Sequence, residues 1–448
     1  MLSIPEAEAR AAALVERAAR AGADAADVLY YADASTSVQV RLGELEDVAR
    51  AEGESIGLRF FTGSRSATVS SSDLSDDALA ALVERAAAMA REAPEDPWAG
   101  LAPEERLMRE DGPDVEGDDG ADPSPVELKA RSLVLEEAGR SVAGITNSEG
   151  AGVSAGRTVI AIATSHGFCR GYSTSGYSSS ASFIAGAGGE MQRDFAYHGV
   201  RHYAELDDPE ALGRLAAERA VARLRPDKLP SGTMPVLFAP RVGNSLLGYL
   251  ASAIGGPSIT RGTSFLLDKE GERLFAENVT VRDDPHRRRG LRSKPFDGEG
   301  LPTRPSNLVE AGRLTGWLLD SASARQLGRA PTGHASRSAG GAPGVGVTNV
   351  YMEPGAVSAE QLIGEVERGV YVTQLIGQGV NPVTGDYSRG ASGFIIERGK
   401  LGAPVAEITI AGNLLDMFAN LVPADDLDFR YTANVPTLRI DGMMVAGA

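Results

Sequence analysis

The chain has 448 residues, with 44 Lys and Arg against 61 Asp and Glu and a formal net charge of −17. This acidic balance disfavours a nonspecific nucleic-acid binder and a protein held on anionic lipid, since both need a basic surface. The apolar fraction of 42% and the charged fraction of 23% are typical of a globular protein, long enough here for two or three domains.

Cysteine usage and the absence of targeting patterns narrow the class further. Cys169 is the only cysteine, so no internal disulfide and no multi-thiolate metal site can form. Residues 1–22 carry Glu and Arg and lack the apolar core of a secretory signal. No stretch approaches the ~20 apolar residues of a membrane span. We therefore expect a cytoplasmic protein that binds neither nucleic acid nor membrane.

The first part of the chain predicts helices that alternate with strands. Hydroxyl N-caps predict helices over 3–21 and 75–92. Between them, residues 36–42 alternate as in a half-buried strand, and residues 57–70 are typical of a hairpin that turns at Thr62-Gly63-Ser64.

Residues 93–126 differ in composition from their surroundings. From Glu92 to Glu127 the chain has 13 acidic and two basic residues, together with several Pro and Gly. Such a composition favours a solvated, mobile linker. We expect a spacer without a binding role.

The rest of the chain is rich in strand and turn signals. Helices are predicted over 125–141 and 208–226, with several antiparallel strands over 145–206. The best domain boundary is Leu229–Gly232, and beyond it the chain is strand- and loop-rich apart from a helix predicted over 358–369.

Histidines supply one candidate metal site. His198 and His202 have the i, i+4 spacing of helical zinc peptidases, in which a glutamate beside the first histidine acts as general base. Here Gly199 follows His198, and aromatic neighbours favour a strand or turn, where the two side chains lie about 13 Å apart. Two histidines without a metal are the better interpretation.

Two nucleophile patterns are also present. Ser154 lies in a G-x-S-x-G pattern, but residues 158–162 predict a strand where a nucleophile elbow needs a helix, so a glycine-tolerant hairpin is the better interpretation. Cys169 precedes Arg170, whose charge could stabilise a thiolate, although a lone cysteine is more often inert.

Two polar segments stand out after the boundary. The basic run His286–Lys294 fits either a solvated loop or a partner for a carboxylate or for the acidic segment. Residues 381–393 place turn-formers and polar groups between two apolar runs, as in a structured turn or in the wall of a cleft.

A combination of short motifs in the second half of the chain indicates a protein family far more specifically than any of these single patterns. The motifs are Ser264–Asp268, Pro295–Gly300, Gly316–Leu319, Ser323–Arg325, Thr332–Ala335, Gly377–Gly379, Thr384–Gly393 and Glu407–Leu414. Together they resemble the TldD/TldE peptidase family, also called PmbA, and the resemblance spans nearly the whole chain.

The family that the chain resembles has two branches, which differ in a metal site. The TldD-like branch carries H-E-x-x-x-H on a helix and a late cysteine as a further zinc ligand. Its first His, its Glu and its second His align with Asn244, Ser245 and Tyr249, none of which can replace its counterpart. Residues 421–446 contain no cysteine. The chain therefore resembles the metal-free TldE/PmbA branch.

This branch implies a function that depends on a partner. A TldE/PmbA-like chain pairs with a TldD-like catalytic subunit as a heterodimer, and the zinc is expected in that partner. The pair is a zinc peptidase that acts on unfolded or modified peptides. The resemblance thus implies no catalytic residue and no metal or other cofactor in this chain, which shapes the substrate chamber.

The resemblance also implies an α+β fold. Residues 1–228 form an N-terminal domain of antiparallel sheet and helices, and residues 229–448 form a β-rich, barrel-like C-terminal domain. Candidates for lining the chamber are the degenerate segment 244–249 and the loop 386–392, where a peptide could be held by strand addition. The loop candidates are Asp386, Tyr387, Ser388, Arg389 and Ser392.

Two other functions remain open on the sequence. One is a stand-alone homodimer that binds peptides or proteins without hydrolysis; the older family description as a modulator of DNA gyrase belongs here, acting through protein because the chain is acidic. The other is an independent hydrolase built on Ser154 or Cys169.

Overall fold

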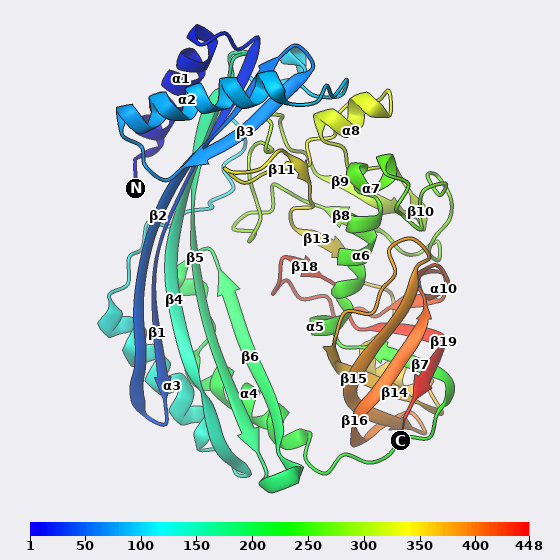
Figure 1. Cartoon of the computed structure of the whole chain (residues 1–448). Helices are drawn as coiled ribbons and strands as arrows, with labels where there is room; N and C mark the ends of the chain where they lie inside the picture. Colours follow the sequence, from blue (N-terminus) through cyan, green and yellow to red (C-terminus); the bar gives the residue numbers. More distant parts are fainter. Residues whose placement is uncertain (448) are drawn as a thin grey trace.

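The computed structural model describes residues 1–447 of the chain. A long curved sheet forms the N-terminal half, and a β-rich body of shorter elements faces it (Figure 1). The expected α+β class, with an N-terminal antiparallel sheet and a barrel-like C-terminal part, is confirmed.

The N-terminal half is built on a six-stranded sheet in which all neighbours pair antiparallel, in the order β3-β2-β1-β4-β5-β6. The predicted hairpin is present, with its turn at Gly63, where φ is +56°. The predicted strand over 36–42 is only the end of a 17-residue strand. The strands are β1 (Ala25–Arg41), β2 (Glu44–Thr62), β3 (Arg65–Ser71), β4 (Ile145–Thr164), β5 (Cys169–Ala185) and β6 (Gln192–Val200).

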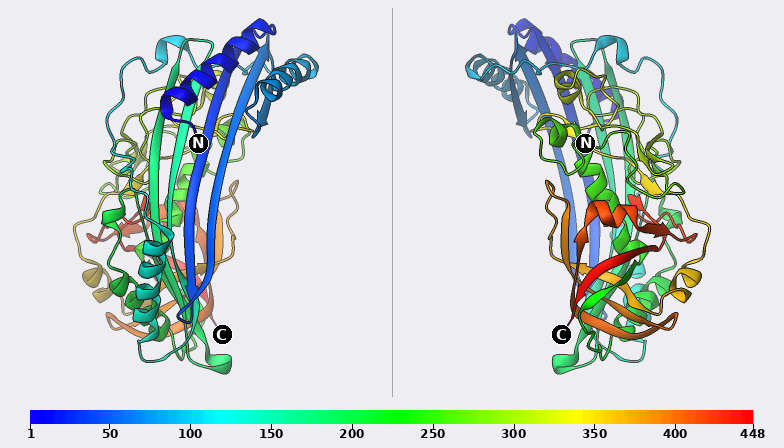
Figure 2. Two further views of the ribbon diagram at one scale, coloured as in Figure 1. Left: turned by 90° about the vertical axis from the view of Figure 1, so that its left-hand side faces the viewer. Right: turned by 90° about the vertical axis from the view of Figure 1, so that its right-hand side faces the viewer.

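Four helices cover the outer face of this sheet, as Figure 2 shows from the side. Their starts follow the sequence signals: Ser3 and Glu6 form a capping box, and the Ser75 hydroxyl accepts a hydrogen bond from the Ala78 amide. Alanines and leucines on the helices bury against alternate residues of the strands. The helices are α1 (Ile4–Arg20), α2 (Asp76–Glu92), α3 (Pro125–Arg140) and α4 (Pro209–Ala222).

Residues 93–126, which we call the acidic strap, are not the mobile spacer expected from composition. The strap contains the short 3-10 helix Glu104–Arg106. Leu107 and Met108 of the strap are buried against Phe296 and Leu301 of the C-terminal half. Burial of these apolar side chains outweighs the solvation that the acidic composition suggested.

Ion pairs fix the other end of the strap. Glu116 accepts hydrogen bonds from Arg288 and Arg289 of the basic run, and Asp118 pairs with Arg157 of β4 at 2.7 Å. Of the two interpretations of the basic run, partnership with the acidic segment is the one observed. The strap therefore links the two halves of the molecule.

A closed barrel of five strands forms the base of the C-terminal half. The sheet order is β16-β15-β14-β7-β19, and pairing of Ile410 with Val445 joins the first strand to the last. Large apolar side chains such as Phe238 and Met443 fill its core. The strands are β7 (Gly232–Phe238), β14 (Arg368–Ile376), β15 (Asp386–Glu397), β16 (Lys400–Asn413) and β19 (Leu438–Ala446), with β17 (Leu421–Pro423) added beside β19.

Shorter elements lie between the barrel and the upper end of the molecule. The helix predicted over 358–369 ends at Gly364, because the chain then enters the barrel. Each helix within residues 1–447 is too short or too polar to span a bilayer. The division into domains 1–228 and 229–448 stays a prediction. These elements are η2 (Gly188–Glu190), η3 (Tyr203–Glu205), α5 (Pro240–Gly243), α6 (Ser245–Ala253), α7 (Gly256–Thr260), β8 (Val281–Asp283), β9 (Ser306–Glu310), β10 (Arg313–Leu314), α8 (Ser321–Gln326), β11 (Ala335–Ser336), β12 (Gly344–Val345), β13 (Val350–Met352), α9 (Ala359–Gly364), α10 (Leu414–Ala419) and β18 (Ala433–Asn434).

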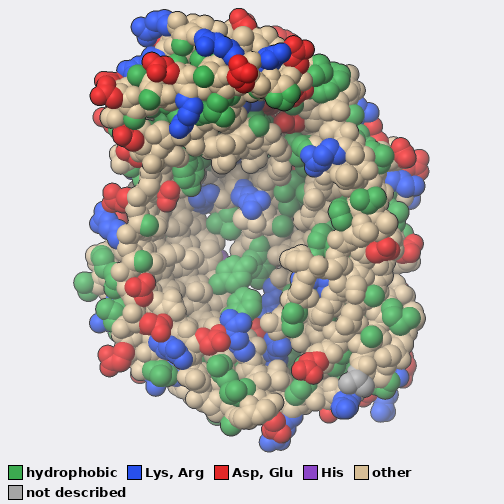
Figure 3. Space-filling view, in the orientation of Figure 1, with side chains coloured by type: hydrophobic (Ala, Val, Ile, Leu, Met, Phe, Trp, Pro, Cys, Tyr) green, Lys and Arg blue, Asp and Glu red, His purple; other side chains and the backbone are tan. Residues whose placement is uncertain are grey.

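The two halves enclose a hollow, which opens on the face shown in Figure 3. The sheet forms one wall and the barrel with α6 forms the other (Figure 1). Alternation along the strands turns small polar residues of β4 and β5 away from the helices and towards this hollow. Among them, the hydroxyls of Ser154 and Ser178 are 2.8 Å apart.

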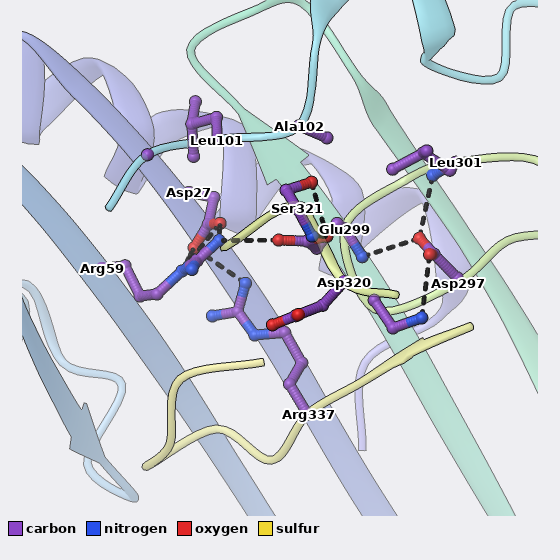
Figure 4. Close-up of polar contacts among 12 residues, drawn as sticks. Asp27, Arg59, Leu101, Ala102, Asp297, Glu299, Leu301, Asp320, Ser321 and Arg337 are labelled. Carbon is purple, nitrogen blue, oxygen red and sulfur yellow. Dashed lines mark hydrogen bonds and ion pairs between the residues drawn. The ribbon is translucent and has the colours of Figure 1, made fainter. Parts of the chain in front are cut away.

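A buried charge network joins the halves at the upper end of the hollow (Figure 4). Asp27 of β1 pairs with Arg59 of β2 and, at 2.7 Å, with Arg337 from the C-terminal half. Glu299 accepts hydrogen bonds from the amide and hydroxyl of Ser321, at 2.8 and 2.7 Å, and its carboxylate lies 4.0 Å from Arg59. All five side chains are buried, so their interactions are only weakly screened.

Burial raises the pKa of the Asp27 and Glu299 carboxyls, whereas the nearby arginines lower it. Although burial favours the neutral acid, the guanidinium groups of Arg337 and Arg59 hold the pKa of Asp27 below its usual value. Burial, together with the nearby Asp297, raises the pKa of Glu299 from 4.5 to about 7. The network thus contains one firmly ionised carboxylate and one that titrates near neutral pH.

Candidate functional site

The three positions that the family resemblance aligns with a metal motif lie at the start of α6, beside the hollow. Asn244 immediately precedes the helix, and Ser245 and Tyr249 lie one turn apart on it. The Ser245 hydroxyl donates a 2.7 Å hydrogen bond to the Val242 carbonyl. The Tyr249 hydroxyl accepts a 3.1 Å hydrogen bond from Arg389 of β15. The motif positions therefore meet one of the candidate residues from a distant segment.

A cavity of about 280 Å³ opens at this point, between the edge of the sheet and the barrel. We call it the arginine pocket. Asn244, Ser245 and Arg389 line it, so these sequence candidates are brought together. The full lining is Phe195, Tyr197, Arg219, Arg241, Val242, Asn244, Ser245, Thr373, Gln374, Leu375, Arg389 and Tyr431.

The other candidates around Arg389 lie elsewhere, because residues 386–392 are not a loop. They form the first part of β15, where alternate side chains point to opposite faces. Tyr387 is buried in the barrel core, with its ring centroid 6.2 Å from that of Tyr249. Asp386 accepts hydrogen bonds from Thr384 and Asn413. Ser388 is exposed, and Ser392 is buried.

The arginine pocket is strongly positive. Arg241 forms a two-pronged ion pair with Asp194 at 2.7 and 2.8 Å, and Arg223, just behind the pocket, lies 3.6 Å from the same carboxylate. Arg219 and Arg389 also reach the pocket. Burial, and then the charge of Arg241, hold the pKa of Arg219 below its usual value. Asp194 therefore pairs with two of these four guanidinium groups, those of Arg241 and Arg223.

These side chains do not fit a zinc ion. Zinc in proteins is held by thiolate, imidazole or carboxylate groups. The motif positions supply an amide and two hydroxyls, and Tyr249 is already hydrogen-bonded to a guanidinium. The nearby positive charges would repel a divalent cation.

Sequence reasoning missed the arginines and aromatic residues that complete the pocket. Arg219 comes from α4, Arg241 from α5, and Phe195 and Tyr197 from β6. These segments are remote in sequence and belong to no motif. The only available signal was the alternation of Phe195 and Tyr197, which places both on one face of a strand.

The histidine and serine patterns do not form a catalytic pair. Ser154 lies in the middle of β4, so the predicted hairpin at this position is wrong. His198 pairs across the strands with Ser179, whereas Ser154 pairs with Ser178, which places the two side chains on opposite faces of the sheet. His198 contacts Asp207, and His202 lies 2.9 Å from the Glu116 carbonyl oxygen. The two histidines therefore have separate partners.

Cys169 is not the activated thiol that its neighbour suggested. Arg170 pairs with Asp111 of the strap at 2.5 Å. The Cys169 thiol lies 3.5 Å from the Glu8 carbonyl oxygen, and burial and the charge of Glu8 raise its pKa. A raised pKa disfavours the nucleophilic thiolate.

Family models match most of the chain. Domain 1 of the PmbA/TldA metallopeptidases matches residues 26–90, their central domain matches 118–224, and their C-terminal domain matches 231–447. The second and third models meet near the boundary predicted at Leu229–Gly232.

The sequences of known relatives agree with these family matches. The chain is 39% identical to metalloprotease PmbA of Escherichia coli O157:H7, over 95% of this chain and 92% of that protein. It is 37% identical to a PmbA homologue of Haemophilus influenzae, over 97% and 94%.

The fold is shared with crystal structures of known proteins. One, from Bacteroides thetaiotaomicron, was described as a proposed modulator of DNA gyrase; it has a TM-score of 0.92 and 27% identity, and covers 100% of both chains. TldE from Thermococcus kodakarensis has the same fold, with a TM-score of 0.86 and 23% identity over 97% of this chain and 99% of that one. The chain belongs to the PmbA/TldD family of metallopeptidases.

Proposed function

We propose that this chain is the metal-free subunit of a cytoplasmic TldD/TldE-type zinc peptidase. In this assignment the chain pairs with a TldD-like catalytic subunit and supplies part of the chamber in which unfolded or modified peptides are held. Zinc belongs to the partner. No residue of this chain acts as a catalytic acid, base or nucleophile.

The arginine pocket is the observation that carries the proposal. Where a zinc-binding helix would present His, Glu and His, this chain presents Asn244, Ser245 and Tyr249 beside Arg389. Such a site cannot polarise a carbonyl through a metal. It nevertheless forms a cavity of about 280 Å³ beside the hollow.

The sheet wall of the hollow supports a role in holding peptides. The face of β4 and β5 that is turned to the hollow carries serine and glycine, with Ser154 opposite Ser178 and Gly152 opposite Ser180. Small side chains allow an extended chain to approach the sheet closely. Recognition that depends on main-chain hydrogen bonds tolerates varied peptide sequences.

Reconstitution with the partner tests the proposal. The purified chain and its cognate TldD-like chain are examined alone and mixed, by sedimentation and by cleavage of an unfolded protein such as reduced casein. We expect a mixed assembly, and cleavage by the mixture that a chelator abolishes. Cleavage by this chain alone would contradict the proposal. Self-association without any binding to the partner would instead support the homodimeric binding protein.

A further inference from the structure

The arginine pocket holds more positive charge than its own carboxylate can balance. Asp194 serves Arg241 and Arg223. Among the described residues, the Arg219 guanidinium donates only to the Phe195 carbonyl, at 3.2 Å, and Arg389 donates only to Tyr249. Within residues 1–447, neither Arg219 nor Arg389 has a carboxylate oxygen within 4.0 Å. In a chain of net charge −17, this concentration of positive charge is local and specific.

Polar atoms at the pocket also lack partners. The Nε atom of Arg389 and the hydroxyl of Thr373 are buried without a hydrogen bond within the described chain. A buried donor without an acceptor is costly, and a charged donor is more costly still. These groups are therefore suited to an acceptor that enters from the pocket.

Aromatic rings form one wall beside these charges. The ring centroids of Phe195 and Tyr197 are 6.2 Å apart, and those of Tyr197 and Tyr431 are 5.5 Å apart. Tyr197 is 43% exposed, so its ring is available to a ligand. The pocket thus combines a site for a negative group with an apolar surface large enough for one side chain.

We propose that the arginine pocket binds a carboxylate of a peptide, held by Arg389 and Arg219, with the neighbouring side chain against Tyr197 and Tyr431. A guanidinium matches a carboxylate because its planar N–H groups can donate two parallel hydrogen bonds. The carboxylate comes either from the C-terminus of the peptide or from an acidic side chain. This assignment rests on the proposed function only in taking the ligand to be a peptide.

Three acetylated tripeptides separate the two sources of carboxylate. Acetyl-Ala-Ala-Phe with a free C-terminus carries an α-carboxylate, acetyl-Ala-Ala-Glu-amide carries only a side-chain carboxylate, and acetyl-Ala-Ala-Phe-amide is neutral. Affinities for the full chain are measured by calorimetry. We expect at least one acidic peptide to bind about tenfold or more tightly than the neutral one, as for the loss of a hydrogen bond to a charged group.

Substitutions test whether the peptide binds in the arginine pocket. Arg389→Gln and Arg219→Gln should each reduce the affinity of the acidic peptide by about tenfold or more and leave that of the neutral peptide unchanged. Arg214→Gln is the matched control, because Arg214 lies on the same helix as Arg219 but is exposed and outside the pocket. Circular dichroism of each variant verifies the fold, and Arg219→Gln still tests the site if Arg389→Gln does not fold.

Each outcome decides the proposal. Preference for the free C-terminus assigns an α-carboxylate, and preference for the glutamyl peptide assigns a side-chain carboxylate. Equal binding of all three peptides, no binding of any, or full binding by both pocket variants overturns the proposal. If these results occur while the mixed assembly still cleaves casein, the carboxylate site fails and the proposed function stands.

Discussion

Asp27→Asn is expected to destabilise the chain by about 3–5 kcal/mol, the usual cost of removing one partner from a buried ion pair. Among residues 1–447, Asp27 is the only carboxylate that forms an ion pair with both Arg59 and Arg337. The asparagine keeps the volume of the side chain but removes the carboxylate that pairs with Arg337, and it leaves Arg59 with only the more distant Glu299, at 4.0 Å. Urea unfolding followed by circular dichroism and by the fluorescence of the buried Trp317 measures the change.

Glu52→Gln provides the matched control. Glu52 pairs with Arg50 at 2.7 Å on the same sheet, but both side chains are exposed. Exposed pairs are screened by water and salt, so this variant should unfold like the wild type. If Asp27→Asn also unfolds at the wild-type urea concentration, the network does not hold the two halves together.

Glu299 should make the stability of the chain depend on pH near neutrality. Its pKa is about 7 in the folded protein against 4.5 as the ordinary value. Because the folded-state pKa is raised, the favourable contribution is fully present below pH 4.5 and is lost as the pH rises through 7. From about pH 5 to about pH 8, this group should lower the free energy of unfolding by about 2–3 kcal/mol.

Comparison with Glu299→Gln isolates this contribution. Any fixed cost of the amide is the same at every pH, so the difference between variant and wild type should shift by about 2–3 kcal/mol in favour of the variant from about pH 5 to about pH 8. Glu52→Gln should show no such shift, because pairing with Arg50 lowers the pKa of Glu52. Parallel pH profiles for wild type and Glu299→Gln would contradict the raised pKa.

Local signals predicted the helices well and the long strands poorly. Ser3 and Ser75 mark helix starts because capping depends on residues only three positions away. The strand β1 begins at Ala25, whereas the sequence indicated only residues 36–42. Residues 26–30 are all buried, so they show no alternation of apolar and polar side chains.

Long-range contacts explain why the prediction for the acidic strap was wrong. Its composition is that of a solvated linker, yet Glu116 meets Arg288 and Arg289 of the basic run, more than 170 positions away. No local pattern contains such a pairing. The basic run itself suggested a partner, and only the fold shows which one.

The candidate site was predicted only in part, because its residues also come together through long-range contacts. The resemblance brought Asn244, Ser245 and Tyr249 to attention, and Arg389 was named with them without any indication that it contacts Tyr249. Arg219 and Arg241 line the same pocket only because the fold brings α4 and α5 to one cavity. A pocket built from six separate segments carries no signature in a single sequence.

Metal content tests the central claim that this chain is a metal-free subunit. Zinc is measured by mass spectrometry in the dialysed chain alone, in the TldD-like partner alone and in their purified assembly. We expect no stoichiometric zinc in this chain alone, and zinc in the assembly. The variant Asn244→Ala should leave the zinc content of the assembly unchanged, because Asn244 lines a pocket of arginines. Stoichiometric zinc in this chain alone, lost in Asn244→Ala, would contradict it.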